Sequence, residues 1–385
     1  MAERFGAPAP FRRPDPDIRH MPHWRRRMTD SFVHEALPMR VVFGAGSMAR
    51  LPDEAERIGS RRILVLSTPQ QRELAQRVTA LLGERAVGVF DEARMHVPVE
   101  TVAAAEAVAA DLAVDGCVAA GGGSTVGLGK ALALRRGLPV LALPTTYAGS
   151  EMTPIWGLTE NARKRTGRAP AVLPRSVVYD PELTMTLPVD VSVTSGLNAV
   201  AHAVEALYAP DGSPVVTAMA EQGVRDLATA LPLIADDPRD RVGRATALRG
   251  AWLCGACLGA TTMGLHHKLC HVLGGMLDLP HAATHAVMLP HVAAYNLPAV
   301  PAAAAALRRS LGLNDTADAA DAVAALTALT ARLGAPGSLR DLGVAESDLA
   351  RVAEEVLAGP YANPRPVNRP ELTALLHAAW TGDAP

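Results

Sequence analysis

The hydrophobic pattern of the chain changes near residue 187. Before this point, short apolar runs rich in β-branched residues alternate with amphipathic stretches of helical length. Apolar strands that alternate with helices are typical of a parallel sheet with both faces covered by helices. The strand-like runs are Val41–Phe43, Arg62–Ser67, Val87–Phe90, Gly116–Ala120 and Leu138–Leu143.

Beyond residue 187, stretches rich in Ala and Leu with helical periodicity dominate, and β-branched runs almost disappear. The contrast predicts an α/β N-terminal nucleotide-binding domain, with a parallel sheet flanked by helices, and an all-α C-terminal domain for substrate and catalysis. The predicted divisions are 1–38 for an N-terminal tail and first strand region, 39–187 for the α/β dinucleotide-binding domain, and 188–385 for the helical domain.

Composition limits the expected partners and location. The length of 385 residues suits two domains of ordinary size. The formal net charge of -2 gives no electrostatic reason to expect nucleic acid or an anionic membrane as a partner. No apolar stretch reaches the roughly 18 residues of a membrane span. Residues 1–27 lack the apolar core of a secretory signal, so we expect a cytoplasmic protein. They form a basic tail, or they precede a natural start at Met28.

The cysteines do not indicate a disulfide framework, because there are only four in the whole chain. Cys254 and Cys257 form a C-x-x-C motif without a second pair of cysteines. We interpret them as small buried thiols on an apolar helix rather than as a redox or zinc pair.

A glycine-rich turn, Gly121–Thr125, follows one apolar run and precedes a stretch of helical length. Glycine lets a backbone approach a phosphate closely, and the free N–H groups of the next helix favour an anion. The turn does not match a P-loop, and a tight structural turn is the alternative interpretation. The next strand ends in a second polar loop, Thr145–Glu151. Ligands bind at the carboxyl ends of parallel strands, so the two loops together predict dinucleotide binding. The candidate cofactor residues are Gly44, Gly46, Ser67, Gly121, Gly122, Gly123, Ser124, Thr125, Thr145, Thr146 and Ser150.

Most of the twelve histidines fall between residues 202 and 291. Asn198 and His202 are four residues apart, as are His267 and His271, so each pair shares one helical face. His281 follows a proline shortly afterwards. Neutral imidazoles suit borderline divalent metals, proton transfer, or donation to a developing oxyanion. We predict that these residues share a functional pocket, and that His266 and His291 are structural.

In this order, the segments resemble the iron-containing alcohol dehydrogenase superfamily from about residue 39 to 380. The resemblance implies a dehydroquinate synthase-like fold, an NAD(P)H-dependent oxidoreductase and a homodimer. The motifs that carry it are Gly121–Ser124, Pro144–Glu151, His267 with His271, Pro280 with His281, and Asn363–Arg365.

Two departures from the family pattern refine the resemblance. The family's metal positions correspond to Asn198, His202, His267 and His281, so an amide replaces the only anionic ligand. We therefore predict that no metal is bound. Gly127 stands where the family usually has Asp. Both departures resemble the maleylacetate reductase branch, which reduces the carbon–carbon double bond of maleylacetate to give 3-oxoadipate with NADH or NADPH, in bacterial degradation of aromatic compounds.

The resemblance implies a pocket lined by His202, His267 and His281, in which Asn198 donates its amide N–H. Hydride addition next to a conjugated ketone places negative charge on the ketone oxygen, and preorganised donors lower that barrier. His267 is our candidate to protonate the enolate or polarise the ketone, and His271 lies on the same face. Tyr147 is either a second proton donor or a packed loop tyrosine. The candidate cations for the dianionic substrate are Lys268, Arg163, Lys164 and Arg365.

Other functions remain open at this point. One is a metal-dependent alcohol dehydrogenase that acts on a small alcohol or aldehyde. Others are an enzyme that uses bound NAD transiently, as dehydroquinate synthases do, a non-catalytic nucleotide-binding protein, and a related reductase recruited to a biosynthetic pathway. The segment Thr68–Gln71 lacks an acidic residue that would repel a 2′-phosphate, so both NADH and NADPH are expected to be accepted.

Overall fold

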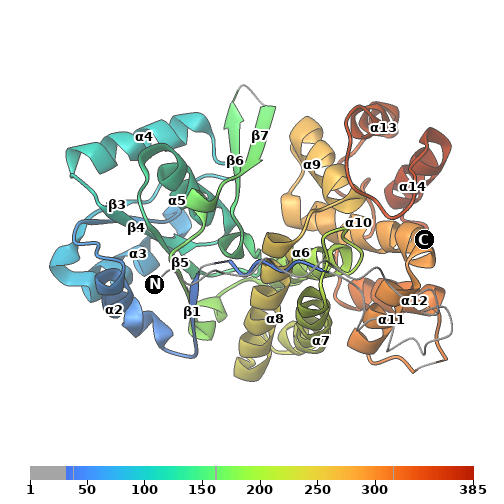
Figure 1. The fold of residues 1–385 in the computed structure, drawn as a ribbon, viewed down its shortest axis with the longest axis horizontal. Helices are drawn as coiled ribbons and strands as arrows, with labels where there is room; N and C mark the ends of the chain where they lie inside the picture. Colours follow the sequence, from blue (N-terminus) through green and yellow to red (C-terminus); the bar gives the residue numbers. More distant parts are fainter. Residues whose placement is uncertain (1–31, 38, 161–162, 315) are drawn as a thin grey trace, which may run out of the picture. The chain divides into compact units, whose positions relative to one another are not determined.

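A six-stranded sheet forms the centre of the first part of the chain (Figure 1). The computed structural model describes residues 32–37, 39–160, 163–314 and 316–385, so the predicted tail of residues 1–27 lies outside the described residues. The strand order is β1-β8-β5-β4-β2-β3, and every neighbouring pair is parallel. Their carboxyl ends therefore lie at one edge. The strands are β1 (Arg40–Phe43), β2 (Ile63–Leu66), β3 (Ala86–Phe90), β4 (Gly116–Gly121), β5 (Val140–Pro144) and β8 (Ser176–Tyr179).

Alternate residues of the strands face two different layers of helices, because side chains alternate across a sheet. On one face, Val65 and Val118 pack with α2 (Leu51–Arg57) and α3 (Arg72–Leu82). On the other face, Leu64 and Ala119 pack with α4 (Val99–Asp111) and α5 (Gly123–Arg136). Strands β2, β4, β5 and β8 are buried along their whole length, which explains their unbroken apolar sequences.

A two-stranded antiparallel ribbon, β6 (Ile155–Glu160) and β7 (Arg163–Arg168), interrupts this pattern between β5 and β8. The sequence pattern did not predict it, because β7 is basic rather than apolar. Its first strand packs on the α4 and α5 side of the sheet through Trp156 and Leu158.

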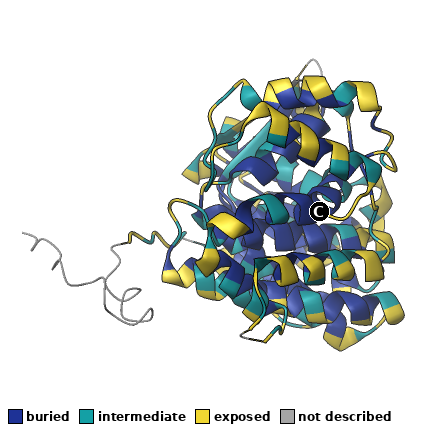
Figure 2. Ribbon diagram, turned by 90° about the vertical axis from the view of Figure 1, so that its right-hand side faces the viewer, coloured by how far each residue is buried: buried dark blue, intermediate teal, exposed yellow. Residues whose placement is uncertain are grey.

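All regular elements after β8 are helices in the part of the chain that the structure describes. One core joins α6, α7 and α8 to α10, α11 and α12, and a second joins α9 and α10 to α13 and α14. Figure 2 shows their buried faces turned inward and their exposed faces outward. The helices are α6 (Val189–Ala206), α7 (Pro214–Asp236), α8 (Arg241–Ala260), α9 (Leu265–Leu277), α10 (His281–Asn296), α11 (Pro301–Ser310), α12 (Ala319–Arg332), α13 (Leu349–Leu357) and α14 (Arg369–Thr381).

The fold class predicted from the sequence is therefore confirmed: a parallel sheet flanked by helices is followed by a helical half. The exact division at residue 187 stays a prediction. Among the described residues, no helix combines the length and apolar character that a membrane crossing requires.

Candidate active site

The glycine-rich turn joins the end of β4 to the start of α5. Gly121 has a φ of +159°, and a Cβ there would lie 2.4 Å from Thr125 Oγ1 and 2.6 Å from Gln71 Oε1. A Cβ on Gly122 would lie 2.9 Å from Thr146 Cγ2. Residues larger than glycine therefore do not fit at positions 121 and 122, just before the first turn of α5. The free N–H groups of that turn suit the phosphates of a dinucleotide.

Two buried hydroxyls at this edge, Ser67 Oγ and Thr125 Oγ1, have no hydrogen-bond partner among the described residues. Ser67 follows β2, and Thr125 lies in the first turn of α5. Both were among the cofactor residues predicted from the sequence. Buried hydroxyls are normally bonded, and a bound phosphate or ribose supplies the acceptors or donors they lack. The residues present therefore fit a dinucleotide.

Gln71 anchors the second of the two predicted cofactor loops and was not predicted as a site residue from the sequence. Its Nε2 donates to Thr145 Oγ1 over 2.7 Å, while the Thr145 N–H donates to the Gly121 carbonyl over 3.2 Å. Gly44 and Gly46 lie at the same edge, after β1. Their N–H groups donate to the Tyr179 carbonyl and the Asp180 carboxylate, so this loop is held by the end of β8. Its contact with a cofactor stays a prediction.

The second loop reaches the helical half through Gly149, which has a φ of +75°. A Cβ on Gly149 would lie 3.0 Å from Gly255 Cα on α8 and 3.4 Å from His202 Nδ1 on α6. Gly255 lies inside the C-x-x-C motif, and Cys254 and Cys257 are buried free thiols. Burial raises the pKa of Cys257 to about 12. The interpretation of this pair as small buried residues is confirmed.

Six imidazoles from α6, α9 and α10 are linked by ring contacts beside this loop, and they include His266, whose ring lies 4.8 Å from that of His285. The ring centroids of His202 and His267 are 5.1 Å apart and stacked, and those of His267 and His285 are 5.0 Å apart. His281 lies 4.4 Å from His285, and the exposed His271 stacks with His281 at 6.1 Å. The structure thus brings together the histidines chosen from the sequence. It adds His285, which lies one helical turn after His281 and was not predicted.

Several buried polar atoms of this group lack partners within the described ranges: His202 Nδ1, His267 Nε2, His285 Nε2 and Asn198 Oδ1. Burial lowers the pKa of His202 and of His285 well below the ordinary histidine value, so both are neutral. The Asn198 amide donates to the Ala148 carbonyl over 3.5 Å. This group therefore offers unpartnered buried polar atoms beside the loop predicted to hold the cofactor, which is what a polar substrate needs.

Glu205 is a further site residue that sequence reasoning missed. It is 1% exposed on α6, and its carboxylate accepts from the His266 N–H over 2.8 Å and contacts Nδ1 of His267. Burial raises the pKa of Glu205, but the His267 imidazole and the hydrogen bonds from α9 outweigh that effect and leave it below its ordinary value. The available signal was an acid among Ala and Val residues, three residues after His202.

The remaining candidates whose side chains are described contact residues outside the imidazole group. Tyr147 is fully buried, and its hydroxyl accepts from Arg244 Nη1 over 3.4 Å. The Lys268 amine lies 4.0 Å from where a Cβ on Gly359 would stand. Arg365 bonds to Glu371 and the Tyr295 carbonyl and stacks on the Tyr295 ring. The side chains of Arg163 and Lys164 lie outside the described residues.

Gly127, the second departure from the family pattern, is explained by Val97. A Cβ at Gly127 would lie 2.7 Å from Val97 Cγ2. Val97 and the preceding His96 both have left-handed backbones, with φ of 49° and 63°. Such a conformation is strained for a β-branched residue. The valine therefore occupies the space that an acidic side chain at position 127 would need.

The donor atoms do not match the metal set that the family resemblance implies. Among the described residues, His266, Cys270 and His285 form a group of three whose ligand atoms all lie within 4.8 Å of one another. Two of these are already joined by a hydrogen bond of 2.9 Å between His266 Nε2 and His285 Nδ1. At the four family positions, His202, His267 and His281 are present, but position 198 supplies an amide in place of the carboxylate. The donor set therefore lacks the one anionic ligand of the family's metal site.

Comparison with known proteins assigns the chain to a family. The family model for iron-containing alcohol dehydrogenase matches residues 38–181, and that for the C-terminal part of the Fe-containing alcohol dehydrogenase family matches residues 192–380. The maleylacetate reductase of Sphingobium indicum is 54% identical over 92% of this chain and 99% of its own length. The chain belongs to the iron-containing alcohol dehydrogenase family. It is accordingly an NAD(P)H-dependent oxidoreductase.

Solved structures agree with this family assignment. The maleylacetate reductase of Agrobacterium tumefaciens has 51% identity and a TM-score of 0.88, covering 93% of this chain and 100% of that one. The maleylacetate reductase of Rhizobium sp. strain MTP-10005 has 51% identity and a TM-score of 0.87 over the same shares. The resemblance to the maleylacetate reductase branch is confirmed.

Proposed function

We propose that this chain reduces the carbon–carbon double bond of maleylacetate with NADH or NADPH, giving 3-oxoadipate in the degradation of aromatic compounds. The observation that carries the proposal is the likeness to proteins named maleylacetate reductase, which are 49% to 54% identical over 92% of the chain. A small unsaturated keto dicarboxylic acid also suits the site, because buried polar atoms of the imidazole group lack partners among the described residues.

The chemistry divides the work between cofactor and protein. When bound, the dihydronicotinamide supplies a hydride to the carbon β to the ketone, and one proton must then reach the carbon α to it. Negative charge develops on the ketone oxygen between these events. The protein therefore has to donate hydrogen bonds to that oxygen and hold a proton for the α carbon.

The pocket residues divide these tasks. His267 turns Nδ1 to Glu205 and leaves Nε2 for the substrate. When both ring nitrogens carry a proton, Nε2–H can donate to the ketone oxygen or protonate the enolate. His202 stacks with His267 and His281 packs edge-on against His285, so both rings belong to the group that faces the substrate in this proposal. Asn198, held by Ala148 at the cofactor loop, helps to place the substrate beside the nicotinamide. Two residues of α9 are candidates to bind a substrate carboxylate: Lys268, which follows His267 directly, and His271, which lies one helical turn after it.

Catalysis in this proposal uses no metal. Position 198 carries an amide where the family has its only anionic ligand, and this substitution supports the proposal. Hydrogen-bond donors perform the task that a Lewis acid performs elsewhere. We further propose that the enzyme is a cytoplasmic homodimer.

The test is oxidation of NADH and of NADPH with freshly prepared maleylacetate, followed by the loss of nicotinamide absorbance, with and without EDTA. We expect turnover that survives the chelator. A small alcohol with oxidised cofactor serves as the control substrate and should give none. Absence of turnover with maleylacetate contradicts the proposed substrate. Turnover that EDTA abolishes, and that zinc or iron restores, contradicts the metal-free mechanism and favours the metal-dependent alternative.

A further inference from the structure

We propose that Glu205 is a positioning residue: it fixes His267 so that Nε2 faces the substrate, and it holds the helix that carries this histidine. The reaction in which His267 takes part rests on the proposed function. The contact between Glu205 and His267 does not depend on that proposal. Glu205 comes from α6 and His267 from α9, so the contact joins two of the three helices that supply the imidazole group.

The carboxylate caps the start of α9. The first N–H groups of a helix have no partners inside it, and a negative charge there is favourable. The His266 N–H donates to Glu205 Oε1 over 2.8 Å, and the His267 N–H donates to Oε2 over 3.4 Å. No side chain of the N-cap residue makes these bonds, because that residue is Gly264.

Gly264 cannot be replaced by an ordinary capping residue. A Cβ there would lie 2.3 Å from the Ala362 carbonyl oxygen and 3.2 Å from Glu205 Oε1. Ser, Thr, Asp or Asn at the N-cap would therefore collide with the backbone of the loop that precedes α14. The cap has to come from another element, and Glu205 supplies it.

The same carboxylate sets the orientation of the imidazole. An ionised carboxylate only accepts hydrogen bonds, so Nδ1 of His267 must carry the proton in their contact. The ring is then fixed, and Nε2 points away from Glu205. That nitrogen is buried, and no partner for it lies in the described part of the chain. Histidine held by a carboxylate in this way is the arrangement that orients general acids and bases in other enzymes.

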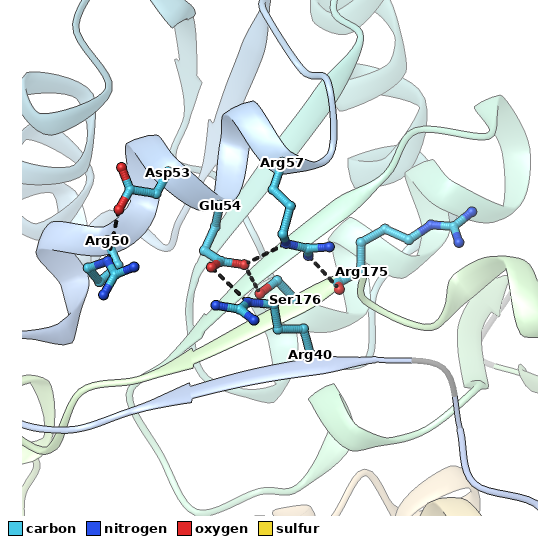
Figure 3. A network of polar contacts seen from close by, with 7 residues as sticks. All are labelled: Arg40, Arg50, Asp53, Glu54, Arg57, Arg175 and Ser176. Atoms are coloured by element: carbon cyan, nitrogen blue, oxygen red, sulfur yellow. Dashed lines mark hydrogen bonds and ion pairs between the residues drawn. The ribbon is translucent and has the colours of Figure 1, made fainter.

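Glu54 provides a matched control, because it is also a buried carboxylate, 1% exposed. Figure 3 shows its partners: Ser176 Oγ donates to it over 2.7 Å, and the guanidinium groups of Arg40 and Arg57 donate over 2.9 and 3.1 Å. All of these belong to the α/β half and none belongs to the candidate site. Loss of charge at Glu54 therefore affects stability alone.

The experiment compares E205Q with E54Q in the full-length enzyme. Glutamine keeps the shape of the side chain, but its one oxygen cannot accept from both the α9 backbone and Nδ1 of His267. For E205Q we expect kcat with maleylacetate to fall about a hundredfold or more, by analogy with carboxylate-to-amide changes behind other catalytic histidines, with KM for NADH little changed. For E54Q we expect a lower melting temperature and an unchanged kcat.

A double variant separates positioning from general damage. If Glu205 acts through His267, E205Q lowers kcat no further in a chain that already carries H267N. Losses that multiply in the double variant overturn the proposal. So does a kcat of E205Q equal to that of E54Q.

A third measurement does not depend on turnover. In proton–nitrogen spectra of protein labelled at histidine, the Nδ1–H signal of His267 is assigned by its loss in H267N. We expect this signal to be lost or strongly shifted in E205Q and retained in E54Q. An unchanged signal in E205Q overturns the proposal. If the wild-type chain fails to reduce maleylacetate but the signal behaves as expected, the proposed substrate is wrong and the placement of His267 by Glu205 stands.

Discussion

Gly149 of the cofactor loop and Gly255 of α8 meet backbone against backbone. A Cβ on Gly255 would lie 2.9 Å from both Cα and O of Gly149. Gly149 is in turn next to His202, since a Cβ on it would lie 3.4 Å from the imidazole Nδ1. This contact joins the loop predicted to hold the cofactor to α8, beside the imidazole group. We therefore expect the distance between the nicotinamide and the substrate to depend on having glycine at both position 149 and position 255.

Gly255→Ala should separate the loop from α8. Because a methyl group cannot fit against Gly149, we expect kcat to fall about tenfold or more as donor and acceptor lose alignment, with a raised KM for NADH. Steady-state kinetics measures both. The matched control is Gly275→Ala in α9, where a Cβ would have no neighbour within 4 Å. That variant should keep its kcat and gain up to about 1 kcal/mol of stability. Equal kinetics for the two variants would contradict the role of the glycine contact.

Asn198→Asp should not convert the site into a metal centre. The amide N–H that donates to the Ala148 carbonyl over 3.5 Å would become a carboxylate oxygen facing a carbonyl oxygen. We expect a lower kcat and a loss of about 1–3 kcal/mol in the free energy of unfolding. Activity with and without EDTA, and metal content by mass spectrometry, measure the outcome. One equivalent of tightly bound zinc or iron, with activity that depends on it, would show that only the missing carboxylate excludes the metal.

Tyr147→Phe tests whether the loop tyrosine is a proton donor or a packed side chain. Its hydroxyl is fully buried and bonds to Arg244, which is itself buried and tied to Ser192 over 2.7 Å. We therefore expect kcat to stay within about twofold, and the free energy of unfolding to fall by about 1 kcal/mol. Denaturant titration and kinetics distinguish the two roles. A loss of kcat of about a hundredfold would instead identify Tyr147 as the proton donor.

Lys130→Met tests the support under the cofactor loop. The buried amine donates to the Ile155 carbonyl over 2.8 Å and to Thr153 Oγ1 over 2.9 Å, and it also reaches the Ser150 carbonyl. Methionine cannot donate, so we expect a loss of about 1–3 kcal/mol in the free energy of unfolding. A raised KM for NADH should accompany it, because the loop loses its anchor.

The same variant has a pH signature. Burial lowers the pKa of Lys130 to about 7 from its ordinary 10.5, against the opposing effect of Glu151. Between these values the unfolded chain binds more protons than the folded chain, so the Lys130 contribution to stability rises with pH. The stability gap between wild type and Lys130→Met should widen from pH 7 towards pH 10. A gap that narrows over this range would contradict a lowered pKa.

Much of the fold could be predicted because it follows from local pattern. Buried strands such as β2 and β5 are short and wholly apolar, and the helices after β8 have clear periodicity. The ribbon of β6 and β7 could not be predicted, because β7 is basic. Among the described residues, it is a strand through its pairing with β6. Propensity is a weak guide to exposed strands of this kind.

The site was predictable as residue types but not as pairs. His202, His267 and His281 could be chosen by spacing and by resemblance. Glu205 could not be paired with His267, because 62 residues separate them and an acid in an apolar helix has many possible partners. Gln71 was missed for the same reason, since its bond to Thr145 spans 74 residues. Contacts between distant segments need the fold before they can be assigned.

The contact between Val97 and Gly127 has a consequence for how this sequence can change. Neither position is independent, because the valine side chain fills the space above the glycine. A library that randomises position 127 alone should return glycine, whereas one that also allows a small residue at 97 should admit larger side chains at 127. In related sequences the two positions are then expected to covary. A return to an acidic residue at 127 would require position 97 to change first.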